Sequence, residues 1–183
     1  LLRSFPFGSD GNFSHELLIS TINTDLANDL GNLVSRTVAM AQKYFGEKLP
    51  EQQQVDIEKD KELVEMVCSL RDKYEEQMEK YAFQNALMET FKVISRANKY
   101  IDETQPWVLA KDEANKPRLA AVLYNLVEAL RFVTTLLQAY LPNTTPRIAA
   151  QLGYTAEDLK FETLAKFGHL TDVKVAKGEV IFP

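Results

Sequence analysis

The chain has 183 residues, enough for one hydrophobic core, and 45% hydrophobic with 26% charged residues is the composition of a soluble globular protein. Its seven glycines are few for an all-β protein, no apolar run approaches the ~18 residues of a membrane span, and its single cysteine excludes an internal disulfide. The net charge of −5 argues against a nucleic-acid binder that relies on a broad positive field, so any RNA binding must rest on local contacts.

The first 13 residues predict an extended entry with a turn around Gly8 and Gly11. They begin with neither an initiator Met nor a secretory signal, so we expect the chain to be part of a longer polypeptide. Ser14 is a suitable N-cap for a helix that continues to Phe45 and ends at Gly46. A break or kink is expected in this helix, somewhere in residues 22–28.

Apolar side chains spaced by three and four residues, bounded by prolines, predict the remaining helices. In chain order we expect a polar surface loop over 46–58, helices over 60–81, 82–101 and 116–141, a short helix over 145–152, and short pieces over 155–183. The final pieces alternate apolar and polar residues but are too short for a sheet of their own. This tail either lies on the helices or pairs with something outside the chain.

Five amphipathic helices with short connections predict an all-α helical bundle with a short extended C-terminal tail. We divide the chain into a junction segment, 1–13, the bundle, 14–153, and a tail region, 154–183. Cys68 lies in an apolar helical pattern and is interpreted as a small buried side chain. Asp102 and Glu103 are interpreted as solvated or capping acids at a helix end, so no catalytic residue is assigned, and one cysteine with two histidines predicts no metal site.

Three parts of the chain carry more specific patterns. They are residues 25–36, which contain Asn-Leu-Val-Ser-Arg, residues 97–107, which contain Tyr-Ile-Asp-Glu-Thr-Gln-Pro-Trp, and the two flanks, 6–11 and 178–183. In this order and spacing they resemble the C-terminal, anticodon-binding domain of bacterial methionyl-tRNA synthetase, over nearly the whole chain. The family's nucleotide-binding signatures, His-Ile-Gly-His and Lys-Met-Ser-Lys-Ser, and its zinc knuckle have no counterpart here. The resemblance therefore implies a domain without the catalytic apparatus.

The resemblance implies that Asn32, Arg36 and Trp107 read the CAU anticodon of tRNA-Met. Asn28 precedes Asn32 by four residues, so Asn28, Asn32 and Arg36 point from one side of one helix, and Asn28 is expected to support the other two. Gly31 beside them has no Cβ, which permits close approach of another backbone or of a nucleotide.

These side chains suit the unstacked bases of an anticodon loop, which proteins recognise by stacking and by hydrogen bonds to base edges. Trp107 offers a large stacking face, Arg36 a planar set of donors, and Asn32 both a donor and an acceptor. Structural roles compete with this interpretation. They are packing of Trp107 against the core, ordinary polar helix positions for Asn28 and Asn32, and a surface ion pair of Arg36 with Asp29 or another acid.

By the same resemblance, the parent enzyme would join methionine to its tRNA with ATP and magnesium, whereas this chain would need no cofactor. The expected partners are the anticodon loop of tRNA-Met and the parent's own catalytic domain, in the cytoplasm, with no membrane and no DNA. Two alternatives remain: the anticodon-binding domain of another class I synthetase, and a helical protein-interaction module that binds a partner helix in an apolar groove.

Overall fold

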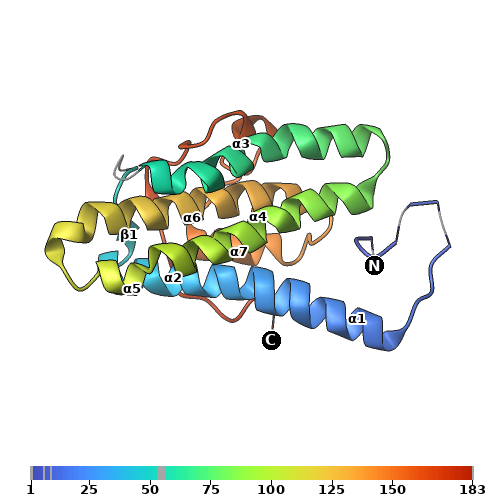
Figure 1. Cartoon of the computed structure of the whole chain (residues 1–183), viewed down its shortest axis with the longest axis horizontal. Helices are drawn as coiled ribbons and strands as arrows, with labels where there is room; N and C mark the ends of the chain where they lie inside the picture. Colours follow the sequence, from blue (N-terminus) through green and yellow to red (C-terminus); the bar gives the residue numbers. More distant parts are fainter. Residues whose placement is uncertain (1, 6, 9, 53–56, 183) are drawn as a thin grey trace.

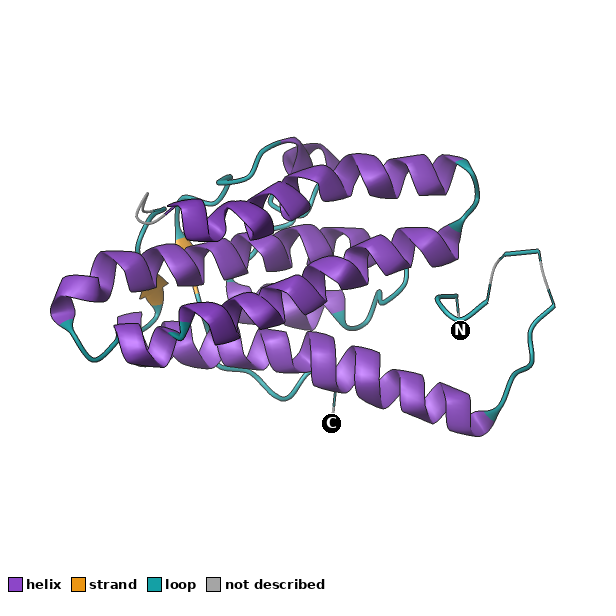
Figure 2. Cartoon of the chain, viewed as in Figure 1, coloured by secondary structure: helices purple, strands orange, loops and turns teal. Residues whose placement is uncertain are grey.

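A computed structural model of the chain describes residues 2–5, 7, 8, 10–52 and 57–182. Its helices are α1 (His15–Thr21), η1 (Ile22–Gly31), α2 (Asn32–Phe45), α3 (Ile57–Glu79), α4 (Phe83–Thr104), α5 (Pro106–Leu109), η2 (Glu113–Asn115), α6 (Lys116–Leu137), α7 (Thr145–Leu152) and η3 (Phe161–Ala165). Strands β1 (Lys48–Leu49) and β2 (Val173–Lys174) form one antiparallel ladder. The all-α bundle expected from the sequence is confirmed (Figures 1 and 2).

The first helical segment runs without interruption from His15 to Phe45, as α1, η1 and α2 (Figure 1). The break or kink expected in 22–28 is wrong, because the backbone there stays helical. The winding changes instead: η1 is a π-helix, and the N–H of Asn32 donates to the carbonyl oxygen of Ala27, five residues back. π-helical turns are frequent at functional sites, and this one leads directly into Asn32.

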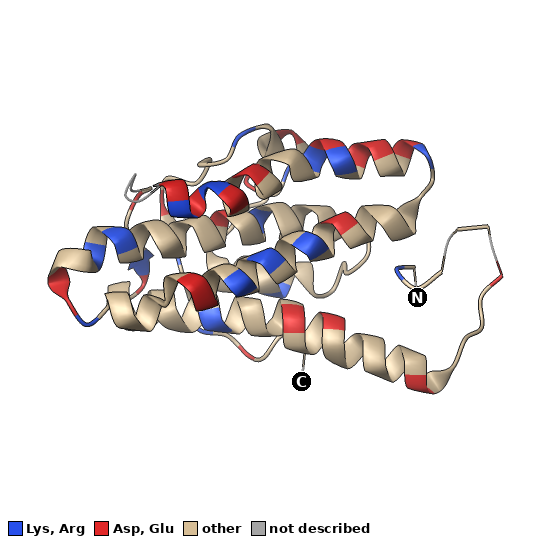
Figure 3. Cartoon of the chain, in the orientation of Figure 1, with Lys and Arg blue, Asp and Glu red and all other residues tan. Residues whose placement is uncertain are grey.

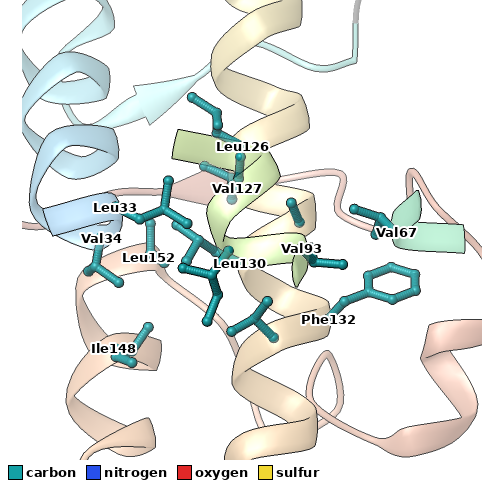
Figure 4. Packing of buried hydrophobic residues seen from close by; sticks show 14 of the residues in the cluster. Leu33, Val34, Val67, Val93, Leu126, Val127, Leu130, Phe132, Ile148 and Leu152 are labelled. Atoms are coloured by element: carbon teal, nitrogen blue, oxygen red, sulfur yellow. The ribbon is translucent and has the colours of Figure 1, made fainter. Parts of the chain in front are cut away.

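Helix α6 lies at the centre of the bundle, and every residue from Arg118 to Leu137 is buried. It packs against α2, α3, α4 and α7, and Figure 4 shows the aliphatic side chains of these helices meeting those of α6. By length and composition the stretch Glu113–Leu137 could cross a membrane, but its most apolar part is fully buried inside the protein. It is therefore the core helix around which the bundle is built.

One ion pair lies inside this apolar helix. Glu128 and Arg131 are both fully buried, with 2.9 Å between Arg131 Nη2 and Glu128 Oε2. Glu128 also accepts hydrogen bonds from the backbone N–H groups of Gly168 and Leu170, at 3.0 and 3.1 Å. Arg131 donates to carbonyl oxygens at the two ends of the segment 158–166, at 3.3 and 3.0 Å. The pair therefore fastens the tail region to the centre of the bundle, and the apolar spacing alone gave no sign of it.

A second buried network joins the start of α6 to the end of α4. Arg118 donates two hydrogen bonds to the carboxylate of Asp60 on α3, at 2.8 and 2.7 Å. The hydroxyl of Tyr100 on α4 donates to the same carboxylate at 2.5 Å and accepts from the amide of Asn125 on α6 at 3.3 Å. Two charges and a phenol are thus satisfied together, which buried polar groups require. The network fixes the part of α4 that leads to Trp107.

Two surface expectations need correction. Cys68 is exposed, because Leu63, Val67 and Leu70 form the inward face of α3 and Cys68 is one residue, or about 100°, off that face. The loop expected over 46–58 contains β1, and the tail pairs with it through Leu49 and Val173. The tail therefore lies on the bundle and finds its strand partner within this chain. Residues 53–56 of that loop, and Pro6, Ser9 and Pro183 of the flanking motifs, lie outside the described residues.

Glu128→Gln is expected to lower the free energy of unfolding by roughly 3–5 kcal/mol, because it leaves the buried Arg131 charge without its counter-ion. Urea unfolding at neutral pH measures the change. The matched control is Glu157→Gln, which removes an exposed partner of Lys160 and should leave stability close to that of the wild-type chain. Equal midpoints for the two variants would contradict the importance of the buried pair.

The stability of the chain is expected to fall as the pH rises above about 10, the usual pKa of tyrosine. Burial, reinforced by the hydrogen bond to Asp60, raises the pKa of Tyr100. The folded state therefore favours the neutral phenol, and its contribution is complete below the unfolded-state pKa and is lost at higher pH. Tyr100→Phe should reduce the loss of unfolding free energy between about pH 9 and pH 11 in urea titrations. An unchanged pH dependence in this variant would refute the role of Tyr100.

Candidate functional site

The polar residues predicted on the first helix lie on the outside of the bundle. Asn28 is in η1 and Asn32 begins α2, and both are exposed. Arg36, one turn further along α2, is half-buried. These three side chains form what we call the polar ridge.

The ridge meets the end of α4 through an ion pair. Nη2 of Arg36 lies 2.8 Å from Oδ1 of Asp102, which is in the last turn of α4. The surface ion pair considered for Arg36 from sequence, with Asp29 or another acid, is formed, and its partner is Asp102. Asp29 has another role, because its carbonyl oxygen accepts a hydrogen bond from the amide of Asn98 on α4, at 3.1 Å. Two contacts therefore hold α4 beside η1 and α2.

Trp107 follows Asp102 by five residues and lies at a sharp corner. Gln105 has φ of 46°, in the left-handed region, and ends α4, while the buried Pro106 begins α5. The backbone N–H of Val108 donates to the carbonyl oxygen of Gln105 at 2.8 Å, which closes the turn. The indole is 42% exposed, so it is not a core residue. The corner presents a large aromatic face to solvent from a rigid backbone.

Charged neighbours surround this corner. Glu103 accepts from Arg96 at 2.8 Å and from Lys99 at 3.3 Å. Desolvation raises the pKa of Glu103, but the hydrogen bonds and charges of Arg96 and Lys99 together outweigh it, so the pKa lies below its usual value. Both acids at the end of α4 are therefore paired with basic side chains, and both remain exposed to solvent, as the sequence predicts. Within the described residues, no group of three or more His, Cys, Asp and Glu side chains is placed to hold a metal ion.

The other side of the ridge faces the C-terminal tail. Asn28 and Asn32 line a hollow of about 470 Å³, together with Ser35 and, from the tail, Val180 and Phe182. Trp107 is not among the residues that line it. The structure therefore joins Arg36 to the Trp107 corner, and Asn28 and Asn32 to a hollow beside the tail.

Gly31 allows the tail to lie close against the helix that carries the polar ridge. A Cβ on Gly31 would lie 3.1 Å from the ring of Phe182 and 3.1 Å from the carbonyl oxygen of Leu26. The close approach expected at this glycine is made by an aromatic ring of the same chain. Sequence reasoning missed both Phe182 and Asp102 as neighbours of the ridge. Both lie inside the strings that carry the family resemblance, which was the available signal.

Comparison with known proteins agrees with this architecture. Residues 49–182 match the family described as the anticodon binding domain of methionyl tRNA ligase, and residues 1–38 match the family of class I tRNA synthetases (M). Methionine–tRNA ligases of Caldanaerobacter subterraneus and Bacillus subtilis are 53% and 48% identical over 100% of this chain. The chain spans 28% of the length of each of those relatives.

Solved structures show the same fold. Methionyl-tRNA synthetase of Mycobacterium tuberculosis, bound by methionyl-adenylate, superposes with a TM-score of 0.91 and 31% identity over 100% of this chain and 36% of that one. Its ligand-free form gives a TM-score of 0.92 at the same identity, with 37% of that chain covered. The helical arrangement, the matched family and the relatives agree. The chain belongs to the methionyl-tRNA ligase family, and it is the family's anticodon-binding domain.

Proposed function

We propose that this chain recognises the CAU anticodon of tRNA-Met and that Asn32, Arg36 and Trp107 read its bases, with Asn28 in support. The observation that carries the proposal is the Arg36–Asp102 ion pair, because it joins the polar ridge to the corner from which Trp107 projects. In this proposal Trp107 supplies a stacking face for one base, and Arg36 supplies a fork of guanidinium donors for a base edge.

The Arg36–Asp102 ion pair is weak enough for Arg36 to leave Asp102 and bind a base instead. Asp102 has 65% of its side chain exposed, and a pair of this kind is worth about 0–1 kcal/mol. Stacking of one base on Trp107 would contribute about 1–3 kcal/mol. Arg36 can therefore turn from Asp102 to a base edge at small cost, while Asp102 keeps the guanidinium near the corner before RNA arrives.

The acidic net charge of −5 does not oppose this proposal. Acidic and basic residues are interspersed along α3 and α4, whereas the long helix of α1, η1 and α2 carries few charges (Figure 3). A few base-specific contacts on that helix need no broad positive field, provided that other parts of the ligase hold the rest of the tRNA.

The whole ligase would use ATP and magnesium to join methionine to tRNA-Met in the cytoplasm, and this chain would contribute recognition alone. Reading the anticodon at a distance from the reaction requires coupling between the two sites. We propose that residues 1–13 form the junction through which this chain connects to the catalytic domain, with 14–153 as the bundle and 154–183 as the tail region.

The surface near that junction suits a docked domain. Large apolar side chains are exposed there, namely Leu2, Phe7, Phe13, Leu17, Ile19, Ile22, Tyr81 and Met88. None of the residues of α1 is buried, and an apolar groove of about 350 Å³ lies between η1, α4 and the end of α6. Apolar surface of this extent marks an interface, and we assign it to the ligase's catalytic domain.

Trp107→Ala is expected to weaken binding of a CAU anticodon stem-loop by roughly 5- to 150-fold, the equivalent of one lost stack. Fluorescence anisotropy at low salt measures the affinity. Tyr81→Ala, which removes a 68% exposed aromatic at the turn between α3 and α4, is the matched control and should bind like the wild-type chain.

Stem-loops that differ only at the first anticodon base test specificity, and the wild-type chain should prefer CAU while Trp107→Ala and Arg36→Gln lose that preference. Equal affinity for all stem-loops in the wild-type chain would refute anticodon reading and favour a protein-interaction module. A preference for a different anticodon would assign the chain to another specificity within class I.

If the catalytic domain docks on this surface, α1 should be protected from amide hydrogen exchange. Amide hydrogen exchange over residues 15–22 is expected to be slower in the full-length ligase than in the isolated chain, because burial of the apolar face suppresses local opening. Exchange in α5, on the opposite end of α4, serves as the internal control and should be equal in both. The same exchange rate for residues 15–22 in both proteins would contradict this interface.

A further inference from the structure

A groove continues along α2 beyond the predicted reading residues. The hollow that contains Asn28 and Asn32 adjoins a second one of about 530 Å³, since Ser35 and Val180 line both. The second hollow lies between the outer face of α2 and residues 177–180, and the tail passes along α2 in Figure 1. Together they form what we call the tail groove, with α2 on one side and the tail on the other.

The tail wall of this groove is fixed by hydrogen bonds to its backbone. The amide of Gln151 donates to the carbonyl oxygen of Glu179 at 2.7 Å. Arg147 donates to the carbonyl oxygens of Val180 and Ile181, at 2.8 and 3.0 Å. Gly178 packs so closely on Gln151 that a Cβ there would lie 2.7 Å from its amide nitrogen. Because α7 holds the tail by its backbone, the side chains of Lys177, Glu179 and Val180 are available to a ligand.

Basic side chains stand at the far end of the groove. Lys43 of α2 and Lys177 of the tail line it, and both are exposed. Within the described residues neither forms an ion pair, whereas the exposed Lys80 and Lys92 each pair with a glutamate three or four residues before them. Glu179 supplies the one acidic side chain of the lining. The groove thus carries a local positive charge on a chain whose net charge is −5.

We propose that the tail groove binds the sugar-phosphate backbone of the tRNA next to the anticodon, with Lys43 and Lys177 contacting phosphates. The inference rests on the proposed anticodon reading, because Asn28 and Asn32 occupy one end of the same groove. Lys43 is 11 residues beyond Asn32, so it lies about 16 Å further along α2, within reach of nucleotides that flank the bases being read. Contacts of this kind position RNA without selecting its sequence.

The test is the salt dependence of binding to the CAU stem-loop by the double variant Lys43→Gln/Lys177→Gln. Each lost phosphate contact should lower affinity by up to about fivefold and reduce the slope of log K against log salt by about 0.7. The preference for CAU over other anticodons should remain, because no base contact is removed. Lys73→Gln, an exposed lysine of α3, is the matched control and should change neither quantity.

The variant Glu179→Gln tests the same groove through the opposite change in affinity. Removal of the acidic side chain of the groove should raise affinity for the stem-loop, an effect that loss of structure would not produce. If the double variant keeps the affinity and salt slope of Lys73→Gln, or if Glu179→Gln binds no more tightly than the wild-type chain, the groove does not carry RNA.

The two proposals fail in different ways. A wild-type chain without anticodon preference overturns the proposed reading of bases and this inference with it. If the wild-type chain prefers CAU but the lysine variants bind like the control, RNA binding in the tail groove is refuted and anticodon reading is not. The groove would then be a site for a protein segment.

Discussion

The constraint on which the structure depends is that α6 has no face suited to water. Every residue from Arg118 to Leu137 is buried, so helices must cover it on all sides, and α2, α3, α4 and α7 do so. Burial of this helix also traps polar groups that the surrounding segments must satisfy. Backbone groups of the tail region hydrogen-bond to Glu128 and Arg131. Arg118 donates to Asp60 of α3, which also accepts a hydrogen bond from Tyr100 of α4. Covering one apolar helix therefore determines where the other elements lie.

The candidate site is a consequence of that packing. Placing α2 and α4 on the same central helix brings Arg36 to Asp102 and Asn98 to the backbone of Asp29. The same arrangement leaves the tail, held by α7, to run past Gly31 with Phe182. Residues more than 60 positions apart in sequence thus become neighbours of the polar ridge. The outward face of the long helix formed by α1, η1 and α2 carries the ridge. The end of α4 lies on one side of the ridge, and the tail lies on the other.

The corner before Trp107 is held rigidly, whereas the Arg36–Asp102 ion pair can exchange partners. The corner before Trp107 contains Gln105 at positive φ, a conformation that costs roughly 1 kcal/mol or more and that surrounding structure must maintain. The buried network of Asp60, Tyr100 and Arg118 holds the helix that leads to it. The Arg36–Asp102 pair, by contrast, is exposed and weak, so the guanidinium can change partners. The proposed capture of an unpaired base would use both features, a fixed aromatic side chain and a movable donor.

The helices were predictable from the sequence, because apolar spacing, Pro117 and Gly46 are local signals that tertiary contacts did not override. It also identified the family, through patterns of which one, residues 25–36, contains the polar ridge and another, residues 97–107, contacts it. Local patterns did not indicate the partner of Arg36, the exposure of Trp107 and Cys68, the π-helical winding of η1 or the position of the tail. Each of these depends on side chains distant in sequence, or on which face of a helix its neighbours leave uncovered. The buried Glu128–Arg131 pair was likewise not predictable. Charges inside an apolar helix are stable only because partners from residues 158–170, distant in sequence, hydrogen-bond to them.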